Sequence, residues 1–254
     1  MAAMPVTPMP APRPEPAPLS EGARILNTFV APGKTFADLR RSARWWVPFL
    51  LLSVVSLAFF YLVDQKIGFR KVVENQIGAS AKASRQMEQL PPDQRNQAMA
   101  RQIAGTRYFL YGYPAVIFLW NLIIAAILFA TFKFAAGSGV LFKTSLAIVM
   151  YASLPLLVKT LLAMLSLAAG ASPDAFSIQN PVATNPGYFV APGESPFLYS
   201  VATALDVFMI WTLVLTGIGF STAGKVKRST SMAVVFAWYV LFSIGSASIG
   251  ALFS

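Results

Sequence analysis

The stretch Phe197–Phe220, FLYSVATALDVFMIWTLVLTGIGF, decides the fold. It has the length of a membrane-spanning helix, because about 20 apolar residues cross the hydrocarbon core of a bilayer. Asp206 stands near the middle of this stretch. A carboxylate at that depth costs about 2.5–3.5 kcal/mol on insertion scales unless it is protonated or paired. The stretch therefore predicts a spanning helix whose acidic group needs a partner elsewhere in the chain.

The composition indicates that the rest of the chain is of the same kind. Hydrophobic residues make up 56% of it and charged residues 12%, whereas soluble domains carry about 25% charged residues. The chain has no cysteine and no histidine, which removes disulfides, thiolate nucleophiles and the commonest metal ligand. We expect an all-α integral membrane protein with no metal, no cofactor and no catalytic site.

Four further apolar segments resemble the first and predict five spans in total. The spans are expected at residues 45–63, 108–132, 144–169, 197–220 and 232–253, so that residues 45–253 form a five-helix transmembrane domain. The one sizeable polar loop, residues 64–107, has a helical pattern interrupted at Pro91-Pro92. We expect it to form an amphipathic hairpin on the membrane or on the ends of the spans. A cap that binds a ligand or a partner is the alternative.

Two segments precede the first span. Residues 1–19 hold seven prolines, whose spacing forbids a helix and predicts a disordered cytoplasmic tail, or alternatively a docking peptide for a proline-binding domain. Residues 20–44 predict short amphipathic helices at the membrane interface, with Arg40, Arg41 and Arg44 on a basic face.

Basic residues flank the apolar segments, so the net charge of +10 indicates contact with anionic lipid headgroups and not with nucleic acid. The candidate headgroup-binding residues are Arg40, Arg41, Arg44, Lys225, Lys227 and Arg228. The short loops and the arginines before the first span predict a cytoplasmic N-terminus and an outer C-terminus in the cell (inner) membrane. The first loop, with eight basic residues, argues the other way, but it is long and also holds four acids.

With that orientation, Lys159 in the third span and Asp206 in the fourth lie at a similar depth, roughly 15 Å below the outer boundary. Their helices are consecutive and therefore neighbours by default. The sequence predicts an intramembrane Lys159–Asp206 pair, with Asn121 and Tyr151 as candidate polar neighbours. The alternative is that Lys159 extends outward to the interface and Asp206 is neutral. Pro155 predicts a kink in the third helix, with the freed carbonyl facing the bundle.

Small residues recur at i, i+4 spacing in the last two spans, which allows helices to approach closely. The pairs are Gly217 with Ser221, Ser243 with Ala247, and Ser246 with Gly250. Packing of the fourth span on the fifth is the simpler interpretation, and a homo-oligomer is the alternative.

Several stretches together resemble the bacterial branch of the Yip family, the Ypt/Rab-interacting membrane proteins. They are P-x-x-x-F at 32–36, YASLP at 151–155, WTLVLTGIGFS at 211–221, the basic patch at 225–228 and the WY pair at 238–239. The resemblance covers about residues 24–252. It implies a small helical membrane domain without catalytic residues and, in eukaryotic relatives, roles in vesicle trafficking, membrane shape and binding of prenylated GTPases. The long first loop and the short proline-rich tail depart from the eukaryotic pattern, so no GTPase-binding residue is carried over.

Two functions from different classes follow. The first is a non-enzymatic membrane-organising or trafficking-like adaptor of the Yip type, with a membrane or cytoplasmic protein as partner. The alternative is a small transporter or channel-like protein that uses the Lys159–Asp206 pair and the Pro155 kink, although the chain shows no internal repeat of the transporter kind. An intramembrane enzyme is disfavoured, because there is one embedded Asp and because Ser153 and Lys159 fall on different sides of one helix.

Overall fold

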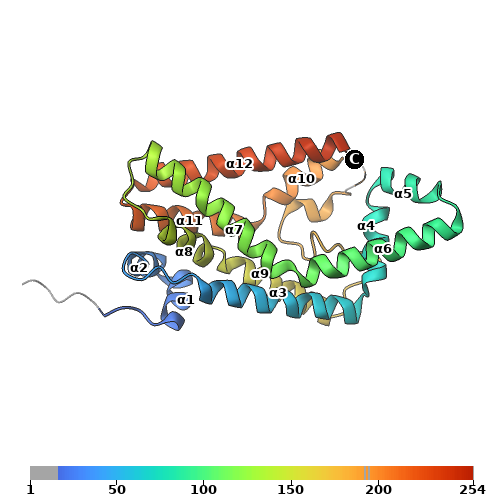
Figure 1. The fold of residues 1–254 in the computed structure, drawn as a ribbon, viewed down its shortest axis with the longest axis horizontal. Helices are drawn as coiled ribbons and strands as arrows, with labels where there is room; N and C mark the ends of the chain where they lie inside the picture. Colours follow the sequence, from blue (N-terminus) through green and yellow to red (C-terminus); the bar gives the residue numbers. More distant parts are fainter. Residues whose placement is uncertain (1–16, 192, 194, 254) are drawn as a thin grey trace, which may run out of the picture.

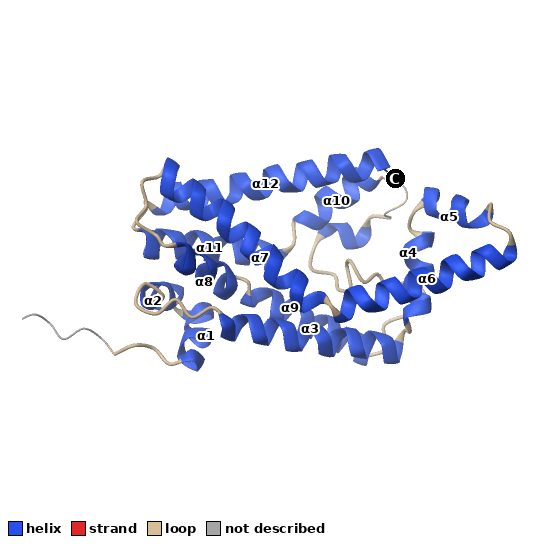
Figure 2. Ribbon diagram, viewed as in Figure 1, coloured by secondary structure: helices blue, strands red, loops and turns tan. Residues whose placement is uncertain are grey.

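The protein is described by a computed structural model that covers residues 17–191, 193 and 195–253. Most of the proline-rich tail, residues 1–16, lies outside the described residues. The described part consists of helices and loops and contains no strand (Figure 2). Five of its helical segments are long and apolar enough to cross a membrane, which confirms the predicted all-α fold with five spans. They are α3 (Trp46–Lys66), α7 (Tyr113–Ala130) with a π-helical turn to Ala135, α8 (Phe142–Ala152) with α9 (Leu154–Ala168), α11 (Val207–Gly224) and α12 (Arg228–Phe253).

The fourth span begins ten residues later than the apolar run suggests. Helix α10 (Pro196–Ala204) ends before Asp206, and α11 starts directly after it. The reason is that Asp206 caps α11, with its Oδ1 accepting the backbone N–H groups of Phe208 at 3.0 Å and Met209 at 3.2 Å. Aspartate is a preferred residue at this capping position because its side chain satisfies N–H groups that have no partner within the helix. Asp206 therefore lies at a helix start and not inside a helix.

The second and third spans are also shaped by glycine and proline. Helix α6 (Pro92–Tyr111) takes the first residues of the expected second span, 108–111, and α7 begins after Gly112 with a proline in its first turn. In the third span, α8 ends at Ala152 and α9 carries Pro155 in its first turn. A proline at a helix start removes an N–H that has no partner there anyway. The predicted kink at Pro155 is thus a junction between two helices, and Pro155 itself is buried.

The two ends of the bundle differ in construction (Figure 1). At one end lie α1 (Glu21–Val30), α2 (Pro32–Asp38) and the turns that join α7 to α8 and α11 to α12. At the other end lie α4 (Phe69–Gly78), α5 (Ala81–Glu88), α6 and the end of α12. The helices of the 64–107 loop project beyond the spans, and Asn75 of α4 donates to the carbonyls of Pro173 and Phe176 in the loop after α9. Helix α1 and the end of α12 lie at opposite ends, as five spans require.

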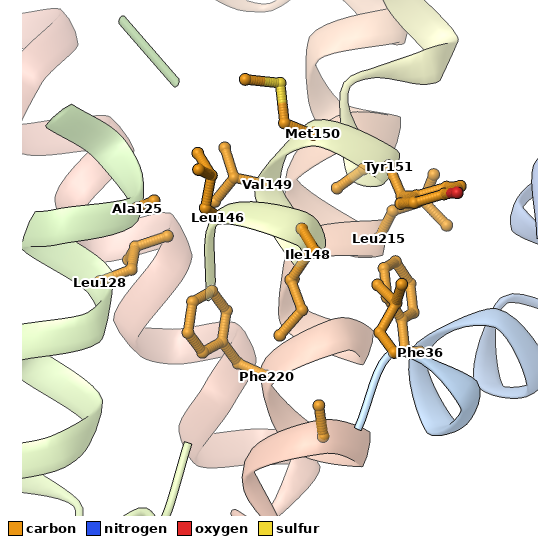
Figure 3. Packing of buried hydrophobic residues seen from close by; sticks show 14 of the residues in the cluster. Phe36, Ala125, Leu128, Leu146, Ile148, Val149, Met150, Tyr151, Leu215 and Phe220 are labelled. Carbon is orange, nitrogen blue, oxygen red and sulfur yellow. The ribbon is translucent and has the colours of Figure 1, made fainter. Parts of the chain in front are cut away.

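Helix α2 is part of the bundle core. Phe36 and Leu39 are fully buried, and Phe36 lies beside Ile148 of α8 (Figure 3). Gly219 of α11 makes this approach possible, because a Cβ atom there would run into Ile148 and lie 3.1 Å from Phe36 Cδ1. The apolar side of the segment before the first span therefore packs on α8 and α11, while Arg40, Arg41 and Arg44 stay exposed.

One of the small-residue pairs serves the contact between α11 and α12. Gly217 lies against Met232, and its carbonyl accepts a hydrogen bond from Ser231 Oγ at 2.8 Å. Ser246 and Gly250 on α12 are exposed. Homo-oligomerisation through that face of α12 stays a prediction.

Candidate functional site: two buried ion-pair networks

Lys159 and Asp206 meet where α9 passes the start of α11. Lys159 Nζ lies 2.7 Å from Asp206 Oδ2. The side chain of Asp206 is 4% exposed, whereas that of Lys159 is 23% exposed. Removing a carboxylate from water to this degree is costly unless it has a cation and further donors. The lysine supplies the cation and reaches toward the surface of the bundle.

The carboxylate of Asp206 has four donors besides the lysine. Thr184 Oγ1 and Asn185 Nδ2 donate to Oδ2, at 2.5 and 3.2 Å. The two capping N–H groups of α11 occupy Oδ1. A carboxylate offers about four lone-pair sites, so five donors leave no free acceptor for a transferred proton or a substrate. This geometry favours a structural function that fixes α9, the 180–185 loop and α11 in one register.

Thr184 and Asn185 were not identified from the sequence as members of this site. They lie in a loop rich in Pro, Asn and Gly, where no periodic pattern indicates which way a side chain points. Asn185 is also held by Asn180, and the two amides exchange hydrogen bonds of 2.8 and 3.2 Å. The only available signal was the run of uncharged hydrogen-bonding residues in a loop without Lys or Arg.

Asn121 and Tyr151, the candidate neighbours of the pair, make their hydrogen bonds elsewhere. Asn121 Oδ1 accepts from Ser153 Oγ at 3.1 Å, and its Nδ2 donates to the carbonyl of Ile117 at 2.8 Å. Tyr151 donates its phenol O–H to Glu21 Oε2 at 2.6 Å. Tyr151 thus belongs to a second network at the other end of the bundle.

The second network joins α1, α2 and α8 around Arg24. This arginine is 1% exposed. Its Nε and Nη2 each lie 2.7 Å from Asp38 Oδ2, and its Nη1 lies 3.1 Å from Glu21 Oε1. The carbonyl of Arg24 accepts from Thr28 at 2.8 Å and from Thr35 at 2.9 Å. The α1–α2 hairpin is therefore held by a buried ion pair and by two threonine hydroxyls.

The charges of this network are balanced. Burial alone would lower the pKa of Arg24, but the hydrogen bond to Asp38 and the nearby charge of Glu21 outweigh it and hold the pKa of Arg24 above its ordinary value. Arg24 is therefore a permanent cation between two carboxylates. Arg44 adds a longer contact, 3.4 Å from Glu21 Oε1. Because Glu21 also accepts from Tyr151, the network ties the hairpin to the third span.

The family model described as the Yip1 domain matches residues 26–249. The chain belongs to the Yip1 family. The matched region contains the first four spans, most of the fifth and the Lys159–Asp206 pair, together with Asp38 and Tyr151 of the second network. No curated protein and no solved structure matched the chain.

The start of the Yip1 match falls inside α1. Glu21 and Arg24 precede it, while their partners Asp38 and Tyr151 lie within it. The segment just before the matched region is therefore bonded to the Yip1 domain, and the two form one packed unit.

The candidate headgroup-binding residues all gather at the end of the bundle that holds α1 and α2. Arg40, Arg41 and Arg44 follow α2, Lys225 and Lys227 stand in the turn from α11 to α12, and Arg228 begins α12. All six are exposed.

Proposed function

We propose that this multi-pass Yip1-domain protein is a non-enzymatic membrane-organising protein, of the adaptor or trafficking-like type, whose basic end binds anionic lipid headgroups. The proposal also places the protein in the cell (inner) membrane, with the basic end and the N-terminus in the cytoplasm and the C-terminus outside. The distribution of charge along the bundle carries the proposal.

The described residues at the α1–α2 end hold ten basic side chains and two acidic ones. The basic residues are Arg24, Lys34, Arg40, Arg41, Arg44, Lys133, Lys143, Lys225, Lys227 and Arg228, and the acids are Glu21 and Asp38. Both acids are engaged by Arg24. Nine of the basic side chains, all except Arg24, are exposed. The exposed surface of this end is therefore strongly positive.

A positive surface next to spanning helices is attracted to anionic lipids by about 1 kcal/mol for each Lys or Arg near the surface. Short basic loops and juxtamembrane arginines favour the cytoplasmic side. The two effects act on the same end of this bundle. The saturated hydrogen bonding of Asp206 supports a non-enzymatic function, because this embedded carboxylate has no free acceptor with which to do acid–base chemistry.

The test is lipid selection by the full-length protein in nanodiscs that contain equal amounts of phosphatidylcholine and phosphatidylglycerol. Native mass spectrometry counts the lipids that stay bound after release of the protein. We expect retention of phosphatidylglycerol over phosphatidylcholine. The triple variant Lys225→Asn, Lys227→Gln and Arg228→Gln should lose most of that preference. Asparagine replaces Lys225 because the backbone at residue 225 has a positive φ of 55°, which Asn tolerates.

The matched control neutralises three exposed basic residues at the opposite end, Lys66→Gln, Arg70→Gln and Arg101→Gln. It removes the same charge and should keep most of the preference. Equal retention of both lipids by the wild-type protein would refute the proposal. So would an undiminished preference in the 225–228 variant.

A further inference from the structure

A surface hollow of about 460 Å³ lies at the basic end of the bundle. Its walls come from the turn into α2 at residues 31–34, from the last two turns of α11 and from the first residue of α12 (Figure 1). The volume falls within the range of about 300–1,000 Å³ that is typical of small-molecule sites. The hollow is separate from both ion-pair networks, since none of their charged residues lines it.

Two cations line this hollow from different elements. Lys34 lies in α2 and Arg228 begins α12, and both side chains are exposed. Neither forms an ion pair within the described chain. The described residues that line the hollow include no acid, and the two acids of this end, Glu21 and Asp38, are engaged by Arg24. The two positive charges are therefore not neutralised by any described residue.

Thr222 of α11 adds a hydroxyl to the same wall. This hydroxyl makes no hydrogen bond within the described chain, whereas those of Thr216 and Thr160 bond to the carbonyl four residues earlier, at 2.8 and 2.9 Å. The hydroxyls that lack a partner and are also closed off from water are those of Ser53 and Thr212. The Thr222 hydroxyl is therefore open to the outside, and it can donate to a ligand in the hollow without giving up an existing bond.

The backbone on both sides of the hollow is fixed by hydrogen bonds. Ser221 Oγ donates to the carbonyl of Val226 at 3.1 Å, which holds the turn after α11 against the helix and fixes the start of α12. On the other side, Thr35 Oγ1 donates to the carbonyl of Arg24 at 2.9 Å and holds α2 to α1. Helix α2 also packs on α11. Because the two cations stand on fixed elements, less ordering is needed when an anion binds between them.

The hollow lies at the end of a spanning helix. Thr222 stands two residues before the end of α11 at Gly224, which is about 3 Å along the helix axis. The unpaired cations and the free hydroxyl are thus placed near the boundary between the apolar part of the bundle and water. A phosphate on a lipid headgroup reaches this level, and so does a phosphate dissolved in the adjoining water.

We propose that this hollow binds a phosphate monoester through Lys34, Arg228 and the Thr222 hydroxyl. Near neutral pH such a group carries about 1.5 to 2 negative charges and three strong acceptor oxygens, which match two unpaired cations and one hydroxyl donor. Arginine binds phosphate through its planar fork and lysine binds it as a point charge. The proposal rests on the proposed attraction of anionic groups to the basic end, and it assigns one specific site within that end.

The first arm of the test uses the full-length protein in phosphatidylcholine nanodiscs that hold equal amounts of two anionic lipids. One is phosphatidic acid, a phosphate monoester, and the other is phosphatidylglycerol, a diester with a single charge. The pH is about 8, above the second pKa of about 6 of a phosphate monoester. Native mass spectrometry counts the lipids that stay bound, and we expect phosphatidic acid to be retained over phosphatidylglycerol.

Variants of the lining residues make the test specific. Lys34→Gln and Arg228→Gln should each lower the ratio of phosphatidic acid to phosphatidylglycerol about tenfold, the effect of one lost hydrogen bond to a charged group. Thr222→Val keeps the shape of the side chain and should lower the ratio about fivefold. Arg40→Gln and Lys227→Gln are the matched controls, because each removes one exposed charge of the same end from a residue that does not line the hollow. They should leave the ratio unchanged.

The second arm separates the two sources of the phosphate. Inorganic phosphate is added to the protein in nanodiscs of phosphatidylcholine alone, and binding is followed by the width of its phosphorus NMR line. Line broadening that Lys34→Gln abolishes would show that the hollow takes up phosphate from solution. No broadening, together with retention of phosphatidic acid in the first arm, would assign the ligand to the lipid headgroup.

Three results would overturn the proposal. The first is equal retention of phosphatidic acid and phosphatidylglycerol together with no binding of inorganic phosphate. The second is binding of either ligand that survives both Lys34→Gln and Arg228→Gln, which would place the site elsewhere. The third is an equal loss in the control variants, which would show diffuse attraction by the whole end. None of these results requires a loss of the preference for phosphatidylglycerol over phosphatidylcholine, so this proposal and the proposed function fail separately.

Discussion

The contact between Lys159 and Asp206 makes a prediction that can be worked out from its geometry. Asp206→Asn removes the negative charge but keeps an oxygen for the N–H groups of α11. Lys159→Met removes the positive charge and keeps an apolar stem of similar length. The double variant removes both charges and leaves neither ion unpaired.

Removing one partner of a buried ion pair costs about 3–5 kcal/mol. Here the cost should be smaller, because Lys159 is 23% exposed and the carboxylate has four other donors. We expect each single change to lower the free energy of unfolding by about 2–3 kcal/mol. The double change should cost no more than the worse single one, which corresponds to a coupling energy of about 2 kcal/mol.

The assay is unfolding of the purified protein in mixed micelles, followed by helical circular dichroism while the denaturing detergent is increased. Control titrations establish that unfolding is reversible for each variant. Simply additive losses, or losses below about 0.5 kcal/mol, would refute the reasoning, since residues in contact are expected to couple by more than that. Such a result would favour a transport function for the pair, and solute flux in proteoliposomes would then be the measurement to make.

Two further predictions concern the packing of the α1–α2 hairpin. Tyr151→Phe removes a 2.6 Å hydrogen bond to Glu21. It should lower the free energy of unfolding by about 1.5 kcal/mol, the low end of the range for a hydrogen bond to a charged group. An unchanged unfolding curve would show that the hairpin is not held to α8 by this hydrogen bond. Gly219→Ala introduces a methyl group against Ile148 and should destabilise the protein by about 1–3 kcal/mol through overpacking. Gly245→Ala, where nothing lies within 4 Å of the added atom, should be neutral or stabilising in the same melt, and equal losses in both glycine variants would contradict the packing described for α2.

The five spans could be predicted from the sequence, because hydropathy over about 20 residues reflects the thickness of the bilayer and little else. Their ends were predicted less well. The apolar run at 197–220 contains a helix start in its middle, since Asp206 satisfies the first N–H groups of α11. Aspartate is a known capping residue, so the break had a signal in the sequence, but the uninterrupted hydropathy of the run concealed it.

The candidate site was predictable only in part. Lys159 and Asp206 stood out because charges are rare inside spans. Thr184 and Asn185 lie in a loop without periodicity, and their approach to Asp206 depends on tertiary structure. The network of Arg24 was missed for another reason, because Glu21, Arg24 and Asp38 lie in a polar segment where charged residues are ordinary. Only packing reveals that Arg24 is buried.

The proposed binding of anionic lipids depends most on the side of the membrane that the basic end faces. The chain has no cysteine, so single cysteines can report accessibility without interference. In intact cells treated with a membrane-impermeant maleimide, Gln86→Cys in α5 should be labelled, and Ser229→Cys beside the basic turn should be labelled only after the membrane is permeabilised. The reverse pattern would place the basic end outside the cell and contradict the proposed binding of cytoplasmic anionic lipids.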